Sequence, residues 1–345
     1  MARAEWGCRT GNCVASGVCS SQCLRMTAED QAYGLRGHAH PVACLLALPR
    51  SDATGRTMLA SGDGNGEIRL WSLVTRRATR VIQSGHGKHG VLSLASMASS
   101  ELVSQGRDGY VKLWDLNATG DSTPSSTVDT SSRSFCRMAV LPERSVVIVP
   151  SADCDEVCLW NMKAGVLTLK FDMKAGGGKR GMCTCIEVVS AHCILSGSEG
   201  GFVDLWDERQ PRAPVSSYQA FSIAYNPVIE GFISGSSDNV LYAAEISNGS
   251  IVGLPSGNIT MCAEGCSRVV SSPDHQLLAS CTWSNSVLVY TWKSLRLVRQ
   301  LQWHREGVLD VAFLPHDGES PHCTVLATAG KDSKIAVHTL CQRQL

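Results

Sequence analysis

A short apolar stretch that ends in tryptophan recurs along this chain at nearly constant spacing. Its clearest copy is Tyr110–Asp115, which follows a tight turn at residues 107–109. Further copies lie at residues 68–71, 157–161 and 203–207, and their Trp residues are 43, 46 and 46 positions apart. Within each copy an apolar residue, a free position, an aliphatic residue and Trp follow one another, which is typical of a strand with one buried face. A repeat of roughly 40–50 residues predicts stacked supersecondary units rather than one central core.

Three weaker copies complete the series. They lie at residues 240–246, 287–291 and 335–340, and they carry Ala244, Tyr290 and His338 at the Trp position. The period and the Leu-Trp-Asp ending resemble those of WD40 repeats, and the chain then has seven of them. The expected fold is therefore all-β, a seven-bladed WD40 β-propeller whose ring is closed by an N-terminal strand.

The two ends of the repeat region predict how the ring closes. Residues 32–35 form a lone strand before the first repeat, whereas the last repeat ends with its third strand at Leu340. Pairing these two strands removes both exposed edges. The expected domains are a disordered, Cys-containing extension at residues 1–31 and the propeller at residues 32–345. Met26 is an alternative start, which would leave residues 1–25 outside the natural protein.

Charge and cysteine content narrow the functional class. Lys+Arg equals Asp+Glu at 31 each, which argues against a dedicated nucleic-acid or membrane binder. The 16 Cys belong to a long chain, and residues 1–25 hold no apolar run of secretory-leader length. Most of these cysteines lie in apolar strands, as Cys44, Cys136, Cys158 and Cys193 do. We therefore expect small buried thiols in a reducing compartment.

Catalytic, metal and cofactor sites are not expected. The cysteines of residues 1–31 lack the Cys-x-x-Cys spacing of zinc sites. Residues 175–179 (AGGGK) are followed by Arg180 rather than by Ser or Thr, so they fail the phosphate-loop pattern. Residues 63–67 lack the length and the final Glu of a calcium loop, and His316, His322 and Cys323 form only a weak candidate metal site. No nucleophile-elbow or metalloprotease motif occurs, so no enzyme activity, cofactor or small-molecule substrate is expected.

The WD40 resemblance implies a hydrogen-bonded set of His, Ser or Thr, Asp and Trp in each blade, here called the blade network. Blade two has the full set, blade one has Asn65 in place of the Asp, and blade seven has His338 in place of the Trp. The expected network residues are His38, Ser61, Asn65, Trp71, His86, Ser104, Asp108, Trp114, His304, Thr328 and Asp332. Blades three to six depart from the pattern, with Gly200 where blade four should carry the Asp. We expect that half of the ring to depend more on packing than on polar networks.

The candidate partner-binding residues lie on one face of the ring. The residue before each turn Asp should project near the loops that carry the Gly-His pairs. Among these residues we single out Arg107, Glu199, Trp283 and Lys331, together with Lys174, Lys179 and Arg180 of a basic loop at residues 174–182. Trp and Arg are enriched at binding hot spots. For Trp283 two interpretations stay open: an exposed anchor, or an aromatic packed between blades five and six to replace the Trp lost at Ala244.

A second functional motif lies at the end of the fourth repeat. Trp206-Asp207-Glu208-Arg209 forms a WDxR ending, which resembles the box by which some WD40 substrate receptors dock onto a cullin-4 ligase adaptor. An ordinary blade end explains the same residues.

Segments outside the generic repeat carry a more specific resemblance. They include residues 104–108 (SQGRD), 134–137 (SFCR), 149–150 with 155–157, 35–37, and 70–73 with 75–77. The repeat region resembles the G-protein β-subunit-like protein 1 family, which overlaps with ASTRA-associated protein 1. The resemblance implies a non-enzymatic scaffold in nucleus and cytoplasm. It also implies work with the co-chaperones of phosphatidylinositol-3-kinase-like kinases and with chromatin-associated complexes. A γ-subunit partner is not expected, because residues 1–31 lack the heptads of a coiled coil.

Overall fold

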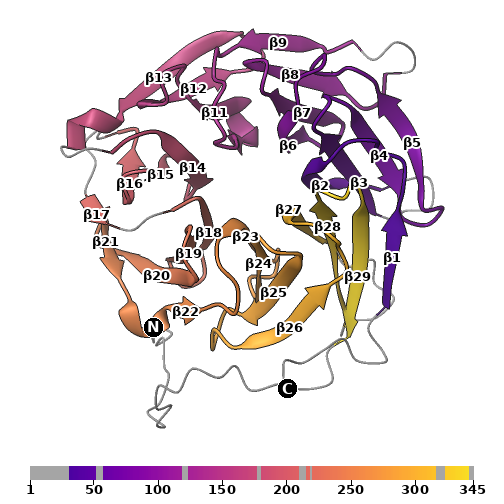
Figure 1. The fold of residues 1–345 in the computed structure, drawn as a ribbon. Helices are drawn as coiled ribbons and strands as arrows, with labels where there is room; N and C mark the ends of the chain where they lie inside the picture. The colour runs from indigo at the N-terminus through magenta and orange to yellow at the C-terminus, as the bar shows by residue number, and fades with distance from the viewer. Residues whose placement is uncertain are drawn as a thin grey trace.

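Seven antiparallel sheets form a closed ring (Figure 1). The computed structural model describes residues 31–51, 57–118, 123–176, 180–209, 215–217, 220–315 and 323–341. Within these residues the helical segments are three 3-10 turns, Pro142–Arg144, Met173–Gly176 and Pro255–Gly257. None of the helices described there has the length and hydropathy needed to cross a bilayer. The predicted seven-bladed all-β propeller is confirmed.

Each blade is built from consecutive strands, numbered from the channel outward. Blade one contains β2 (Val42–Ser51), β3 (Thr57–Asp63), β4 (Ile68–Ser72) and β5 (Arg77–Ile82). Blade two contains β6 (Val91–Ala98), β7 (Glu101–Gly106), β8 (Tyr110–Asp115) and β9 (Ser126–Asp129). Blade three contains β10 (Ala139–Leu141), β11 (Val146–Pro150), β12 (Glu156–Asn161) and β13 (Val166–Asp172). Blade four contains β14 (Cys183–Val188), β15 (Cys193–Ser198), β16 (Phe202–Asp207) and β17 (Val215–Ser217).

The remaining blades follow the same order. Blade five contains β18 (Ser222–Asn226), β19 (Gly231–Gly235), β20 (Val240–Ser247), β21 (Ser250–Gly253) and the short β22 (Ile259–Thr260), which also pairs with β20. Blade six contains β23 (Cys266–Ser271), β24 (Leu277–Thr282), β25 (Ser286–Thr291) and β26 (Leu297–Gln302). Blade seven contains β27 (Val308–Leu314), β28 (Cys323–Gly330), β29 (Ile335–Cys341) and β1 (Gln31–Leu35).

The N-terminal strand closes the ring in blade seven. β1 pairs antiparallel with β29, with Tyr33 opposite Val337 and Leu35 opposite Ile335. Figure 1 shows the indigo β1 beside the yellow β29. Leu35 is buried, and the Arg76 guanidinium of blade one lies 4.1 Å from the centre of the Tyr33 ring. The predicted closure is therefore confirmed, while the extension before Gln31 lies outside the described residues.

Apolar packing is divided among the interfaces between neighbouring blades. One hydrophobic cluster spans each pair: Cys44, Ile68, Val91 and Trp114 join blades one and two, for example. Each sheet thus buries both faces against its neighbours, as the repeat pattern requires. Apolar packing therefore links every blade to both of its neighbours around the closed ring.

The cysteines follow the predicted pattern in part. Burial raises the pKa of the Cys158 thiol to about 11, so that thiol stays protonated at neutral pH. Cys44, Cys136 and Cys158 are buried free thiols, but Cys193 is only half-buried. Cys323 and Cys341 form a disulfide across β28 and β29, where they face each other in the register. This pair departs from the expectation of reduced thiols, and it takes Cys323 out of the weak metal site predicted with His316 and His322, which lie outside the described residues.

Candidate functional site

Blade two shows the hydrogen bonds that make up a complete blade network. His86 Nδ1 lies 2.9 Å from an Asp108 carboxylate oxygen, which only accepts, so Nδ1 carries the proton. The other ring nitrogen then accepts from the Ser104 hydroxyl at 2.7 Å, and that oxygen accepts from Trp114 Nε1 at 2.8 Å. Burial raises the pKa of Asp108, but hydrogen bonds from His86 and the Tyr110 backbone leave it below its ordinary value. The network ties the loop before β6 to β7 and β8.

Blade one builds the same network from a different acid. His38 Nε2 lies 2.7 Å from Ser61 Oγ, and Trp71 Nε1 donates to that oxygen at 2.8 Å. The carboxylate beside His38 Nδ1 belongs to Asp63, at 3.1 Å, and not to the predicted position Asn65. Asp63 is buried at the end of β3 and also accepts from the Asn65 backbone N–H, whereas the Asn65 side chain is exposed. The register prediction failed here because the buried acid comes two residues before the expected position.

The acid of blade one raises the question of a metal site. Among the described residues, His38, Asp63 and Glu67 form a group that could hold a metal ion by distance alone. Their possible ligand atoms lie within 4.8 Å of one another. The guanidinium of Arg69 already contacts Glu67, and Asp63 accepts from His38. Both carboxylates therefore have protein partners, and the geometry fits a turn rather than a metal site.

Blade seven replaces the Trp by a neutral histidine. His304 lies 2.9 Å from both Asp332 Oδ1 and Thr328 Oγ1. His338 Nε2 lies 3.2 Å from the same Thr328 hydroxyl. Burial, with a contribution from the charge of His304, lowers the pKa of His338 to about 4. An uncharged imidazole therefore stands where Trp stands in blades one and two.

Blade four contains a buried ion pair that the sequence analysis missed. Arg180 was predicted in an exposed basic loop, but its side chain is 2% exposed and forms two hydrogen bonds to Asp204, at 2.7 and 2.9 Å. Arg180 lies just before β14, as the network His lies before the inner strand of other blades, so it takes the place of that His. Blade four therefore contains a buried polar pair in addition to its apolar packing against both neighbours. Of the remaining loop lysines, Lys174 pairs with Asp155, and Lys179 lies outside the described residues.

Four of the residues predicted for partner binding lie on the face formed by the starts of the inner strands and the turns between second and third strands, here called the turn face. Arg107, Glu199, Trp283 and Lys331 are all exposed there. Trp283 is 54% exposed, so it is not buried between the sheets of blades five and six. Its ring lies so close to Gly265 that a Cβ on that glycine would stand 2.1 Å from it. The buried aromatic residues at the interface between blades five and six are instead Tyr290 and Trp292.

Three apolar residues of the turn face were not predicted. Phe135, Met182 and Phe221 are 73%, 48% and 39% exposed, and they precede the inner strands of blades three, four and five. The Phe221 and Trp283 rings lie 6.4 Å apart, and the Arg107 guanidinium lies 4.8 Å from the centre of the Phe135 ring. These loops follow no repeat pattern, so only exposure in the folded ring identifies them.

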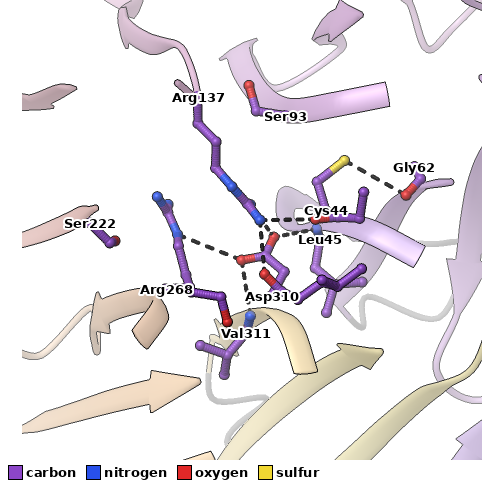
Figure 2. Close-up of polar contacts among 12 residues, drawn as sticks. Cys44, Leu45, Gly62, Ser93, Arg137, Ser222, Arg268, Asp310 and Val311 are labelled. Atoms are coloured by element: carbon purple, nitrogen blue, oxygen red, sulfur yellow. Dashed lines mark hydrogen bonds and ion pairs between the residues drawn. The ribbon is translucent and has the colours of Figure 1, made fainter. Parts of the chain in front are cut away.

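Below this face, an arginine crosses the central channel. Figure 2 shows Arg137, from the segment before β10, reaching toward Asp310 of β27. Its guanidinium lies 2.7 Å from an Asp310 carboxylate oxygen and donates at 2.9 Å to the backbone carbonyls of Ala43 and Leu309. Asp310 in turn accepts from the Leu45 N–H at 2.7 Å. Arg137 thereby joins blade three to blades one and seven and satisfies backbone groups on the free inner edges of their sheets.

A second arginine of the channel is much less fully paired. Arg268 on β23 places Nε 3.6 Å from Asp310 Oδ1, an ion-pair contact drawn in Figure 2. This buried nitrogen has no hydrogen bond to the described residues. Within the described residues its guanidinium donates to no acceptor. Arg137 and Arg268 together line a small cavity of about 50 Å³ on the side of Phe135 and Phe221, and a larger hollow of about 360 Å³ on the side of Met138, Val270 and Phe313. The two arginines therefore separate two hollows of the channel.

One further acidic residue interacts electrostatically with Arg268. Burial raises the pKa of Glu187, on β14, to about 7, although the charge of Arg268 acts to lower it. Glu187 is thus only partly ionised near neutral pH, and the ion pairs of Arg268 among the described residues include Asp310 but not Glu187. The channel therefore holds two guanidinium groups near the carboxyl groups of Asp310 and Glu187.

Comparison with known proteins now defines the family. Residues 78–115 and 256–291 match the WD domain, G-beta repeat family. The chain is 31% identical over 323 residues to guanine nucleotide-binding protein subunit beta-like protein 1 of Mus musculus, covering 89% of this chain and 95% of that protein. The chain belongs to the guanine nucleotide-binding protein subunit beta-like protein 1 family.

Fungal relatives extend this family assignment. ASTRA-associated protein 1 of Yarrowia lipolytica is 28% identical over 243 residues, which cover 60% of this chain and 54% of that protein. The protein of that name from Verticillium alfalfae is 21% identical over 323 residues, covering 81% of this chain and 77% of its own. The resemblance inferred from the segments outside the repeat is therefore confirmed.

Proposed function

We propose that this protein is a non-enzymatic scaffold that docks partner proteins on its turn face. The observation that carries the proposal is the exposed group Phe135, Met182, Phe221 and Trp283 around the channel mouth. Exposed apolar groups of this kind, bordered by charged residues such as Arg107, mark protein interaction sites. By its relation to the ASTRA-associated proteins, the chain would serve assemblies that mature phosphatidylinositol-3-kinase-like kinases or act on chromatin, in nucleus and cytoplasm.

Affinity capture with two surface variants tests this proposal. Arg107→Glu and Trp283→Ala should each reduce capture of kinase co-chaperones at least about fivefold, while the melting temperature stays unchanged because both side chains are exposed. Lys163→Glu, on the turn between β12 and β13 at the opposite face, is the matched control. Undiminished capture by both turn-face variants would move the interface elsewhere.

A second function, as a substrate receptor of a cullin-4 ligase, rests on the WDxR ending. Arg209 is exposed at the end of β16, where it forms a paired contact with Asp207 at 2.8 and 2.9 Å. A protein named DDB1- and CUL4-associated factor 13, from Pongo abelii, is 31% identical over 97 residues, or 28% of this chain. Recovery of the cullin-4 adaptor by the parent protein and its loss with Arg209→Ala would support this function.

A further inference from the structure

We propose that the small cavity at the channel mouth receives the carboxylate side chain of a partner protein, with Arg268 as its counter-ion. The inference rests on the proposed function of the turn face and adds the chemistry of one contact to it. The cavity is lined by Phe135, Phe221 and Ser267 on the outside and reaches Arg137 and Arg268 at its floor.

The two arginines of the floor differ in what they have left to donate. Arg137 is committed to the Asp310 carboxylate and to two backbone carbonyls. Arg268 has one long contact to the same carboxylate, and its Nε is buried without a hydrogen bond. The buried Nε–H group of Arg268 is unfavourable without an acceptor, and the partly exposed guanidinium can be reached by an anion that supplies one. Arg268 is therefore the group of this cavity that can gain most from a ligand.

The other polar groups of the cavity select the same kind of ligand. The three hydroxyl groups of the cavity all donate to backbone carbonyls. Thr184 donates to Ala220, Ser222 donates to Val269 at 3.4 Å, and Ser267 donates to Val308 at 2.7 Å. They do not provide further donors for an anion. A guanidinium fork that forms no hydrogen bond among the described residues, facing a space of about 50 Å³, suits a planar carboxylate, whereas a phosphate group needs several donors around a tetrahedral centre.

The rim of the cavity selects apolar residues on either side of the acid. Phe135 and Phe221 both line it, and Trp283 packs beside Phe221. The segment with Phe135 is fixed by Gln105, which donates to the Cys136 carbonyl at 3.1 Å and accepts from the Met138 N–H at 2.8 Å. A rim that is fixed before binding reduces the entropic cost of docking. The expected occupant is thus an Asp or Glu flanked by apolar residues in an exposed partner loop.

Matched peptides test the proposal directly. The probes are dye-labelled, end-blocked peptides of sequence Gly-Ser-Leu-X-Leu-Ser-Gly, in which X is Asp, Asn or phosphoserine, and binding is followed by fluorescence anisotropy. The parent protein should bind the Asp peptide at least about tenfold more tightly than the Asn peptide, because a charge-assisted pair to Arg268 is lost with the amide. Equal affinity for these two peptides would overturn the proposal, and tighter binding of the phosphoserine peptide would overturn the choice of a carboxylate.

Variants assign the effect to Arg268. Arg268→Gln should remove the preference for Asp over Asn, whereas Arg305→Gln, an exposed arginine before β27, should retain it. A preference that persists in Arg268→Gln contradicts the assignment. If that variant melts early, Phe135→Ser provides the second reading, because it should weaken both peptides equally and leave their ratio unchanged. Partner capture that depends on the turn face, without any Asp preference, would refute this inference alone and leave the scaffold function standing.

Discussion

At the scale of single residues, the acid of each blade network is the most informative position. In blade one the buried Asp63, and not the exposed Asn65, accepts from His38. Asp63→Ala should lower the free energy of unfolding by about 1–3 kcal/mol, because His38 and the backbone N–H groups of the turn lose their acceptor. Asn65→Ala should change it by less than about 0.5 kcal/mol. Urea denaturation gives the free energy of unfolding of both variants. Equal losses in the two variants would mean that Asp63 is not the acceptor on which the turn depends.

A second single residue, His338, makes the stability of the protein depend on pH. Its pKa is lowered to about 4 in the folded chain, whereas an unfolded His has a pKa near ~6.5. The unfolded chain therefore binds the proton first, so stability falls as the pH drops from about 6.5 to 4. This residue accounts for up to about 3 kcal/mol of that loss. His338→Phe, which keeps an aromatic at the position, should flatten the decline in stability measured by denaturation between pH 7 and pH 4.5; an unchanged slope would exclude His338 as its source.

At the scale of elements, β1 is the strand on which closure depends. It covers the edge of β29 and buries Leu35. Deletion of residues 1–37 should lower the stability of the entire ring by on the order of 3 kcal/mol, from lost apolar burial and exposed ladder groups. Deletion of residues 1–25 should leave the melting temperature unchanged, because it removes none of β1. Identical melting of both truncations and the full chain would contradict closure by this strand.

At the scale of the whole molecule, the contact between Arg137 and Asp310 joins blades that are far apart in the sequence. Arg137→Met should destabilise the ring by about 3–5 kcal/mol, because Asp310 is left buried with only a distant cation. The double variant Arg137→Met with Asp310→Asn removes both charges and should recover part of that loss. A double-mutant cycle measured by denaturation gives the coupling, and simple additivity of the two changes would show that the contact contributes little.

The sequence by itself determined the architecture of this protein. Strand alternation recurs before Trp71, Trp114, Trp160 and Trp206 at nearly constant spacing, and a sheet with two apolar faces is stable only between neighbours. The count of seven blades and the closing strand follow from that local pattern. The segment 134–137 also marked the family, although its pattern did not show what Phe135 and Arg137 do.

Only the tertiary structure decided which polar groups meet. Arg137 and Asp310 are 173 residues apart, and Arg180 finds Asp204 only because β14 and β16 lie in one sheet. Such pairs depend on the angle at which each blade approaches the channel, and no repeat period encodes that angle. The exposure of Phe135, Phe221 and Trp283 is likewise a property of the closed ring, because it depends on what neighbouring loops leave uncovered. The candidate site therefore emerges from packing at long range, whereas the fold emerges from periodicity at short range.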